Sequence, residues 1–263
     1  ERAFGGCKSL TSITIPDSVT SIGDKVFDDC SSLTSVTLPR GLTEIGSAMF
    51  ESCSSLASID IPDGVTKIGN YAFSGCSSLQ KVAIPASVTS IGYNAFSNCS
   101  GLRSLTMGDG VSFIGETVFF GCSSLESITL PDSVKEIGWG MFSGCSALTS
   151  LEIPNGVTSI GNGAFANCSS LSSVTIPNSV TEIGGWVFLG CRSLTSPICV
   201  GNHFVFMPPT YKGDYTIPEN ITQIQGHAFY GCSSLTSVTL PDGLTEIGDW
   251  AFSGCSSLQK VAI

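Results

Sequence analysis

The sequence predicts an α/β fold, a right-handed solenoid with one parallel β-sheet and with short arcs or helical turns on the return side. Three observations support this fold class. A cysteine recurs every 23 residues, a proline follows a short apolar stretch in most intervals, and an Ile-Gly pair comes after the proline. A fixed period of this length is typical of solenoids, in which stacked units bury a core that one unit alone could not form.

The cysteines mark the period. They lie 23 residues apart from Cys7 to Cys191, and the pair Cys232 and Cys255 keeps this step. The period places them in one inward column, where neighbouring Cα atoms are about 4.8 Å apart but parallel Cβ directions disfavour the disulfide torsion. We therefore expect buried free thiols that pack as small hydrophobic side chains.

The units extend along the whole chain. We expect residues 1–263 to form one solenoid domain of ten complete units over residues 7–254, with partial units at both ends. The unit over 191–231 is a long variant, because its cysteine lies 41 residues before the next one and the unit thus carries 18 extra residues. Both ends break off within a unit and lack the polar caps of a complete solenoid, so we expect the chain to belong to a longer array.

Each unit begins with a short strand. After Cys30, apolar Leu33, Val36 and Leu38 are separated by small polar residues, an alternation typical of a half-buried strand. Pro39 ends this strand because proline lacks the amide that a strand ladder needs. Equivalent prolines are Pro16, Pro62, Pro85, Pro131, Pro154, Pro177, Pro218 and Pro241.

The second half of each unit returns the chain to the next strand. After a polar turn, Val134, Ile137 and Phe142 supply inward apolar side chains in one such unit. Gly138 allows a backbone conformation that a side chain would obstruct. We expect a short arc or one helical turn here, and some eleven rungs about 4.8 Å apart would give a curved rod on the order of 50 Å long.

The long unit is expected to interrupt this regularity. Residues 199–215 should project from the rod, because neighbouring rungs fix the strand and the arc of a regular unit. Phe204, Phe206 and Met207 form an apolar run that is expected to pack on the solenoid. The polar tip at residues 211–214 would then be the part that a partner contacts.

These motifs carry a resemblance to a known family. The Leu-x-x-Ile/Val-x-Leu/Ile strand, the proline, the Ile-Gly-x-x-Ala-Phe block and the regular cysteine closely resemble the BspA-like leucine-rich repeat family, cell-surface type, over nearly the whole chain. The long unit resembles a long variant of that repeat, which ends at Tyr215-Thr216-Ile217-Pro218. Gln225 departs from the pattern, because other units have glycine there. The resemblance implies a leucine-rich repeat protein for non-catalytic recognition or adhesion, commonly displayed outside the cell.

Composition disfavours other classes of function. Eleven basic residues against 21 acidic ones give a net charge of −10, which disfavours nucleic acid and anionic membranes as partners. No apolar stretch approaches the roughly 20 residues of a membrane-spanning helix, so no membrane insertion is expected. The sequence has no Gly-x-Ser-x-Gly motif, no Cys-x-x-Cys motif and two histidines, His203 and His227. We therefore expect no enzyme activity, no metal site and no cofactor.

Partner binding is expected at the variable positions of the repeat, since packing accounts for the constant ones. On the sheet, the outward strand positions are mostly Ser and Thr, which suit an exposed strand. Asp60, Lys81 and Glu152 interrupt this row of hydroxyls, and together with Arg103 they are the predicted contact residues of the sheet. A hydroxyl row could also order water and bind ice, but these charges and the curvature of the sheet disfavour that interpretation.

A second variable surface lies on the arc side. It holds all three tryptophans and several tyrosines, with His227 expected to be exposed among them. These rings either cover the neighbouring rung or form an exposed ridge for a protein or glycan. With the polar tip of the long unit, the predicted contact residues here are Trp139, Trp186, Trp250, Tyr71, Tyr93, Tyr230, Tyr211 and Lys212.

Two functions remain open from the sequence. One is a binding or adhesion module that recognises a protein or glycan, and the alternative is a structural spacer or stalk within a longer surface polypeptide. The resemblance implies an extracellular or cell-surface location, although buried thiols are equally compatible with the cytoplasm. Sequons at Asn98, Asn167 and Asn220 are as consistent with chance as with glycosylation.

Overall fold

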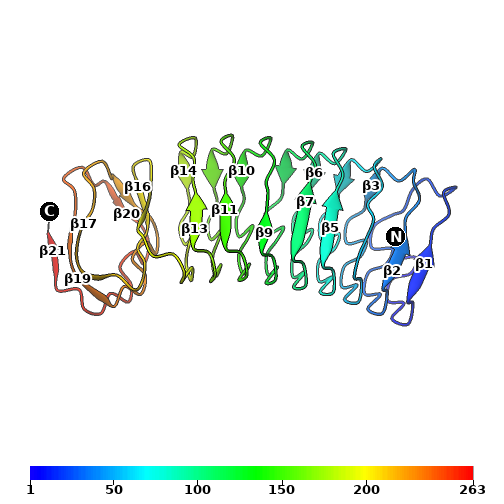
Figure 1. Cartoon of the computed structure of the whole chain (residues 1–263), viewed down its shortest axis with the longest axis horizontal. Coiled ribbons are helices and arrows are strands. Elements are labelled where there is room, and N and C mark those ends of the chain that lie inside the picture. The colour runs from blue at the N-terminus through cyan, green and yellow to red at the C-terminus, as the bar shows by residue number, and fades with distance from the viewer. Residues whose placement is uncertain (263) are drawn as a thin grey trace.

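The computed structural model describes residues 1–262 and shows a rod of stacked rungs (Figure 1). Each regular rung has a first strand before the proline and a second strand that includes the isoleucine of the Ile-Gly pair. A return arc then leads to the next cysteine. Strands of successive rungs pair in parallel and in register, so that Ile45 lies opposite Ile68 and Ile68 opposite Ile91.

The strands form two columns, so the solenoid is confirmed but the prediction of one parallel sheet is wrong. The first column comprises β1 (Ser12–Thr14), β2 (Ser35–Thr37), β5 (Lys81–Ile84), β7 (Ser104–Met107), β9 (Ser127–Ile128), β11 (Ser150–Glu152), β13 (Ser173–Thr175), β17 (Lys212–Thr216), β19 (Ser234–Thr239) and β21 (Lys260–Ala262). The second column comprises β3 (Glu44–Ile45), β4 (Lys67–Ile68), β6 (Ser90–Ile91), β8 (Phe113–Ile114), β10 (Glu136–Ile137), β12 (Ser159–Ile160), β14 (Glu182–Ile183), β16 (His203–Phe206), β18 (Gln223–Ile224) and β20 (Glu246–Ile247). β15 (Ile198–Val200) pairs with β16 and is antiparallel to it.

The expected helical turns are also wrong, since no residue of the described range is helical. The Ile-containing segment is a strand because it alternates, with Glu136 exposed and Ile137 buried. The arcs contain residues in the left-handed conformation, such as Lys25 at φ 57°, which a right-handed helix does not allow. Their amides bond forward to the next rung, as Phe27 N does to Met49 O at 2.9 Å.

The glycine of the Ile-Gly pair lies against the preceding rung. A Cβ on Gly69 would lie 2.6 Å from the backbone nitrogen of Ser47, closer than side chains tolerate. Gln225 takes this position in the long unit, just after β18, where its amide donates to Phe204 O at 2.9 Å. Its side-chain Nε2 also lies 2.8 Å from His203 Nδ1. The replacement of glycine by Gln225 therefore occurs where the neighbouring rung is the irregular one that contains His203 and Phe204.

Phenylalanine rings and thiols fill the core. Neighbouring phenylalanine rings from Phe4 to Phe188 stack at centroid distances of 5.1–6.0 Å. Nine of the column cysteines are buried beside them, and Cys53 Sγ donates to Phe27 O at 3.1 Å. Burial raises the pKa of the Cys53 and Cys122 thiols to about 12, because the thiolate would lose its hydration.

Candidate interaction site at the long unit

The long unit forms an additional rung, so the expected projection of residues 199–215 is wrong. β15 and β16 make an antiparallel hairpin, and β16 takes a place in the second column beside β18. β17 then enters the first column beside β19, and it contains most of the expected polar tip. Residues 204–207 are buried, as expected for the apolar run. The extra residues are absorbed because they supply the strands of another rung.

The array is discontinuous on the N-terminal side of this extra rung. β13 and β14 are each the last strand of their sheet, and a single connecting segment leads on to the C-terminal rungs (Figure 1). The aromatic stack is interrupted at the same place. Phe188 meets Phe206 edge-on, at a centroid distance of 6.1 Å and an interplanar angle of 68°. Stacking resumes between Phe204 and Phe229 at 4.6 Å.

The extra rung has a short return arc. From Phe204 to Lys212, the first residue of β17, the chain advances eight residues, whereas it advances ten from Ile224 to Ser234, their partners in the next rung. An arc that is two residues shorter cannot cover the full width of its neighbour. The pair at residues 208–209 is Pro-Pro, so this part of the arc has no amide to donate to the next rung.

Backbone hydrogen bonds between arcs are lost as a result. In the regular array, the residue before each cysteine donates its amide to the next arc, as Asn167 N does to Leu189 O at 2.6 Å. Gly190 occupies this position, but its amide has no hydrogen-bond partner among residues 1–262. Tyr230 O, the acceptor that the repeat would provide, receives no donor there either. Gly190 and Tyr230 both line one cavity between the arcs.

The return arc that ends at Cys191 and the return arc that ends at Cys232 are in contact at their N-terminal ends and diverge toward the two cysteines. Trp186 N donates to Gly226 O at 3.1 Å, as the repeat requires. Two residues later, Phe188 N has no partner in the described chain, because Ala228 O accepts from Met207 N at 2.7 Å instead. The short arc of the extra rung has therefore taken one acceptor and left the amides of Phe188 and Gly190 without one.

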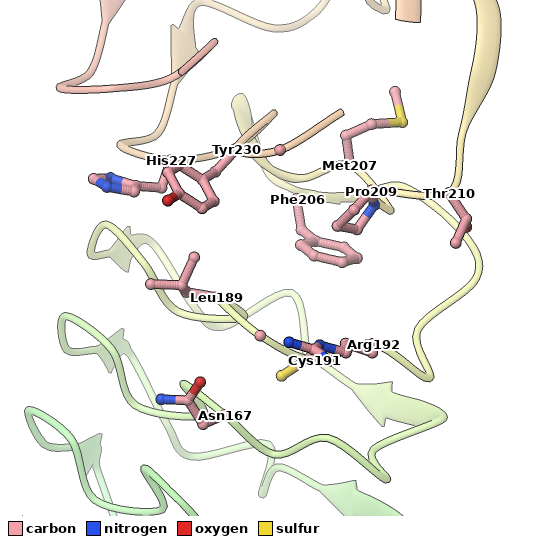
Figure 2. Close-up of a pocket in the computed structure, with 12 residues that line it drawn as sticks. Asn167, Leu189, Cys191, Arg192, Phe206, Met207, Pro209, Thr210, His227 and Tyr230 are labelled. Atoms are coloured by element: carbon pink, nitrogen blue, oxygen red, sulfur yellow. The ribbon is translucent and has the colours of Figure 1, made fainter. Parts of the chain in front are cut away.

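The diverging arcs enclose an open cavity of about 490 Å³, which we call the groove (Figure 2). Leu189 and Arg192 lie on one wall, His227 and Tyr230 on the other, and Phe206 between them. This volume falls within the roughly 300–1,000 Å³ of typical ligand pockets. The walls are mostly apolar and carry a few polar groups, which is the usual composition of a binding site.

Residues at the groove depart from the repeat. The position after the cysteine is serine in nine units but Arg192 here. The position two before the cysteine is Asp, Glu or Ser in six units, whereas the arcs that face the groove have Leu189 and Tyr230. Within residues 1–262 Arg192 has no ion-pair partner, and no acidic residue lines the groove. The sequence analysis did not single out Leu189 or Arg192, although these departures could have indicated them.

An aromatic cluster lies beside the groove, formed by Trp186, His227, Tyr230 and Trp250. His227 is its centre, with centroid distances of 5.4 Å to Trp186, 5.2 Å to Tyr230 and 6.5 Å to Trp250. Trp250 is 69% exposed, and both Trp186 and Tyr230 are 45% exposed. The structure thus brings together three of the predicted contact residues, on the edge of the groove.

The backbone of this cluster is strained. Trp186, His227 and Trp250 have φ of 61°, 62° and 57°, a left-handed conformation that bulky side chains seldom adopt. Gly140 and Gly163 hold the same repeat position in other units, where the conformation has no steric cost. Other residues take the same conformation at this position along the regular array, as at Lys25 and Thr117, so the strain belongs to the repeat and does not mark the cluster.

His227 is half-buried, contrary to the expectation that it is exposed. Its Nδ1 is buried and has no hydrogen-bond partner within the described chain. Burial lowers the pKa of His227 below its usual value, because the charged ring would be poorly hydrated. The nearby Asp249 partly offsets this effect.

The other predicted aromatic residues lie apart from the cluster. Tyr71, Tyr93 and Trp139 are exposed on arcs of the regular array, at 45%, 45% and 51%. Tyr93 contacts Phe113 edge-on, with centroids 6.1 Å apart. Their exposure is compatible with a contact surface, but nothing joins them to the groove.

The predicted charged residues are spread over several rungs. Arg103 forms an exposed ion pair with Glu126 at 3.5 Å. In the long unit, Tyr211 donates its hydroxyl to Asp214 O at 2.9 Å. The remaining predicted contact residues are exposed without such a contact in the described chain: Asp60, Lys81, Glu152 and Lys212.

The described residues 1–262 contain neither a candidate metal centre nor a membrane-spanning helix. No group of three or more His, Cys, Asp or Glu side chains is placed to hold a metal ion. No helix in this range has the length and apolar character needed to cross a bilayer.

Parallel strand columns around a repeating apolar core define a leucine-rich repeat solenoid. The chain matches the family described as BspA type leucine-rich repeat region, in six copies over residues 1–126, 90–206 and 202–263. The protein therefore belongs to the BspA-type leucine-rich repeat family, which confirms the resemblance. Proteins of this type are generally binding or surface modules and not enzymes. The search of curated proteins returned no match.

Solved structures of bacterial leucine-rich repeat proteins are similar to the chain. One from Bacteroides ovatus is 26% identical with a TM-score of 0.62, over 98% of this chain and 80% of that one. A leucine-rich cell surface protein from Faecalibacterium prausnitzii is 30% identical with a TM-score of 0.54, over 96% and 79%. A leucine-rich repeat protein from T. pallidum is 33% identical with a TM-score of 0.57, over 62% and 78%.

Proposed function

We propose that this protein is a binding module that recognises a protein partner through the aromatic cluster and the adjoining groove. The main observation behind this proposal is the set of exposed rings around His227, because Trp and Tyr are among the residues that contribute most of the binding energy in protein interfaces. The cavity beside them offers a pocket that a partner side chain can fill. Clustered rings next to a pocket are the usual arrangement of an interface hot spot.

We also propose that the module acts in adhesion at the cell surface. The support is the F. prausnitzii relative, which is described as a cell surface protein. On this view residues 1–263 are one solenoid, with ten complete units over 7–254. The predicted contacts outside the cluster, such as Tyr71, Trp139 and Lys81, then form separate and weaker contact sites.

The test compares binding by the whole chain and by two double variants. The immobilised chain is probed with serum proteins, extracellular matrix proteins and a glycan array. The variant Trp186→Ala/Trp250→Ala should lose at least about tenfold in affinity for the bound protein. The comparison variant Tyr71→Ala/Trp139→Ala removes exposed aromatic rings of the regular array and should weaken binding far less than the cluster variant, because these rings form only the weaker contact sites.

Thermal unfolding of both double variants separates binding from stability. A sharp fall in melting temperature for the cluster variant, with unchanged affinity per folded molecule, would show that the rings are packing elements only. If the chain binds only a glycan in these assays, the proposal of a protein partner is wrong and the module recognises a glycan. A chain that binds nothing in any of these sets would support the alternative, a structural spacer.

A further inference from the structure

The groove has unsatisfied backbone groups on both walls. Gly190 offers an amide donor and Tyr230 a carbonyl acceptor, and the repeat would have joined them. Unpaired backbone groups cost free energy when water is excluded from them. The chain cannot close this opening itself, because the short arc carries Pro209, which has no amide, at the place where a donor to Tyr230 would be needed.

The side chains around these groups define what would fit. Leu189, Phe206 and Tyr230 make an apolar pocket. The repeat position of Leu189 and Tyr230 carries a small or polar residue in most other units, and Phe206 belongs to the extra residues that other units lack. Arg192 adds one positive charge, in a chain with a net charge of −10 and at a place without a neighbouring carboxylate. An unpaired guanidinium is best matched by a carboxylate, which it can bind through two parallel hydrogen bonds.

We propose that the groove binds an extended peptide segment of a protein partner, with an apolar side chain next to an acidic one. Its carbonyl accepts from Gly190 N, its amide donates to Tyr230 O, its apolar side chain fills the space between Leu189 and Tyr230, and its carboxylate binds Arg192. This inference rests on the proposed function and names the partner chemistry of the same site.

Backbone chemistry favours a peptide over other ligands with a carboxylate. An extended peptide presents donors and acceptors along its main chain, which is how strands add to open edges of other proteins. A fatty acid would satisfy Arg192 and the apolar wall but would leave the Gly190 amide and the Tyr230 carbonyl unpaired. The separated pair of backbone groups is therefore the feature that selects a polypeptide.

The test selects ligands for the full chain from a phage-displayed library of random heptapeptides. We expect the enriched peptides to place Asp or Glu next to Leu, Ile or Phe. A fluorescein-labelled copy of the most enriched peptide is then titrated against variants. Arg192→Ser and Leu189→Ser, which restore the common residues of the repeat, should each weaken binding at least about tenfold. Lys8→Ser and Ala166→Ser make the matched changes in other units and should leave it unchanged.

Amide hydrogen exchange tests the main-chain contact. The bound peptide should slow exchange at Gly190 at least about tenfold and leave Asn167, which is already bonded, unchanged. The proposal is overturned if no peptide is enriched, if the enriched peptides lack an acidic residue, if Arg192→Ser binds equally well, or if Gly190 is not protected. Binding of decanoate that displaces the peptide and matches its affinity would overturn it in favour of a fatty acid. If Trp186→Ala/Trp250→Ala no longer binds the protein partner but Arg192→Ser still does, the proposed function stands and the peptide proposal fails.

Discussion

The regular array up to Phe188 and the junction at the long unit are built from the same repeat but leave different groups unsatisfied. In the array, every second arc amide and each stacked phenylalanine ring has an equivalent partner 22 or 23 residues ahead, as Phe165 N has in Val187 O at 3.0 Å and the Phe165 ring in Phe188 at 5.5 Å. At the junction, the amides of Phe188 and Gly190 have no such partner in the described chain. Along the arcs of the regular array the repeat therefore provides partners for these amides and rings, and at the junction it does not.

This difference shows where a solenoid can place a specific site. A rung that matches its neighbours has its donors, acceptors and apolar faces already used, and its outer surface is uniform. The long unit breaks the match by shortening one arc, which exposes backbone groups and opens the groove. The departures Leu189, Arg192 and Tyr230 occur on the walls of that opening. A break in the period and unusual residues thus coincide.

Core substitutions should separate the two regions most strongly. Phe119→Ala removes a ring that is fully buried between two stacked neighbours, and we expect a loss of about 3–5 kcal/mol in the free energy of unfolding. Phe206→Ala should cost less, about 2 kcal/mol, because its ring borders the groove and water can fill the space. Urea unfolding measures both values. An equal loss would show that the groove is closed in solution.

Amide exchange should show the same contrast at the backbone. Without a ligand, Phe188 and Gly190 should exchange at least about 100-fold faster than Phe165 and Asn167, which hold the same repeat positions one unit earlier and are bonded. Exchange is followed by NMR at neutral pH. Equal protection of the two pairs would mean that the arcs meet in solution and that the groove does not exist.

Much of the fold could be predicted from the sequence because the period is a property of the chain itself. The 23-residue step fixed the stacking, the parallel pairing and the buried cysteine column. The second strand column was missed because its strands in the regular array are two residues long, as in Glu136–Ile137, and two residues do not show a period. The helical turns were wrong because left-handed residues such as Lys25 and Trp186 are not glycine, so the sequence does not reveal them. The division into ten complete units remains a prediction.

The candidate site could be predicted only in part. Trp186, Tyr230 and Trp250 were identified from residue type, and the structure adds that they surround His227. The groove was missed because it depends on the length of an arc, and arc length is known only when the strand pairing of the long unit is known. Arg192 illustrates the difficulty, since a departure from serine has no meaning until its surroundings are placed.

The thiols of the regular array should make the protein sensitive to alkaline pH. Burial raises the pKa of Cys122 from the ordinary 9.0 to about 12. Between these values the unfolded chain loses protons that the native chain keeps, so stability falls as pH rises from 9 to 12, by about 1.4 kcal/mol per pH unit for each such thiol. Cys122→Ala should decline less steeply in urea unfolding at pH 8–11. Cys7→Ala changes an exposed thiol and should retain the steeper slope.

The smallest expected effect concerns His227 at the junction. Its pKa is lowered by burial, and the Trp186 ring 5.4 Å away contributes to that burial. Trp186→Ala should therefore raise the pKa of His227 toward the ordinary 6.5, whereas Trp139→Ala, an exposed ring of the regular array, should leave it unchanged. NMR titration of the imidazole measures this shift. Because the folded pKa is below the unfolded one, the stability from neutral His227 is present above pH 6.5 and is lost as pH falls through the folded value. An unchanged pKa in Trp186→Ala would show that the ring does not cover His227 in solution, and the cluster would then be separate exposed side chains.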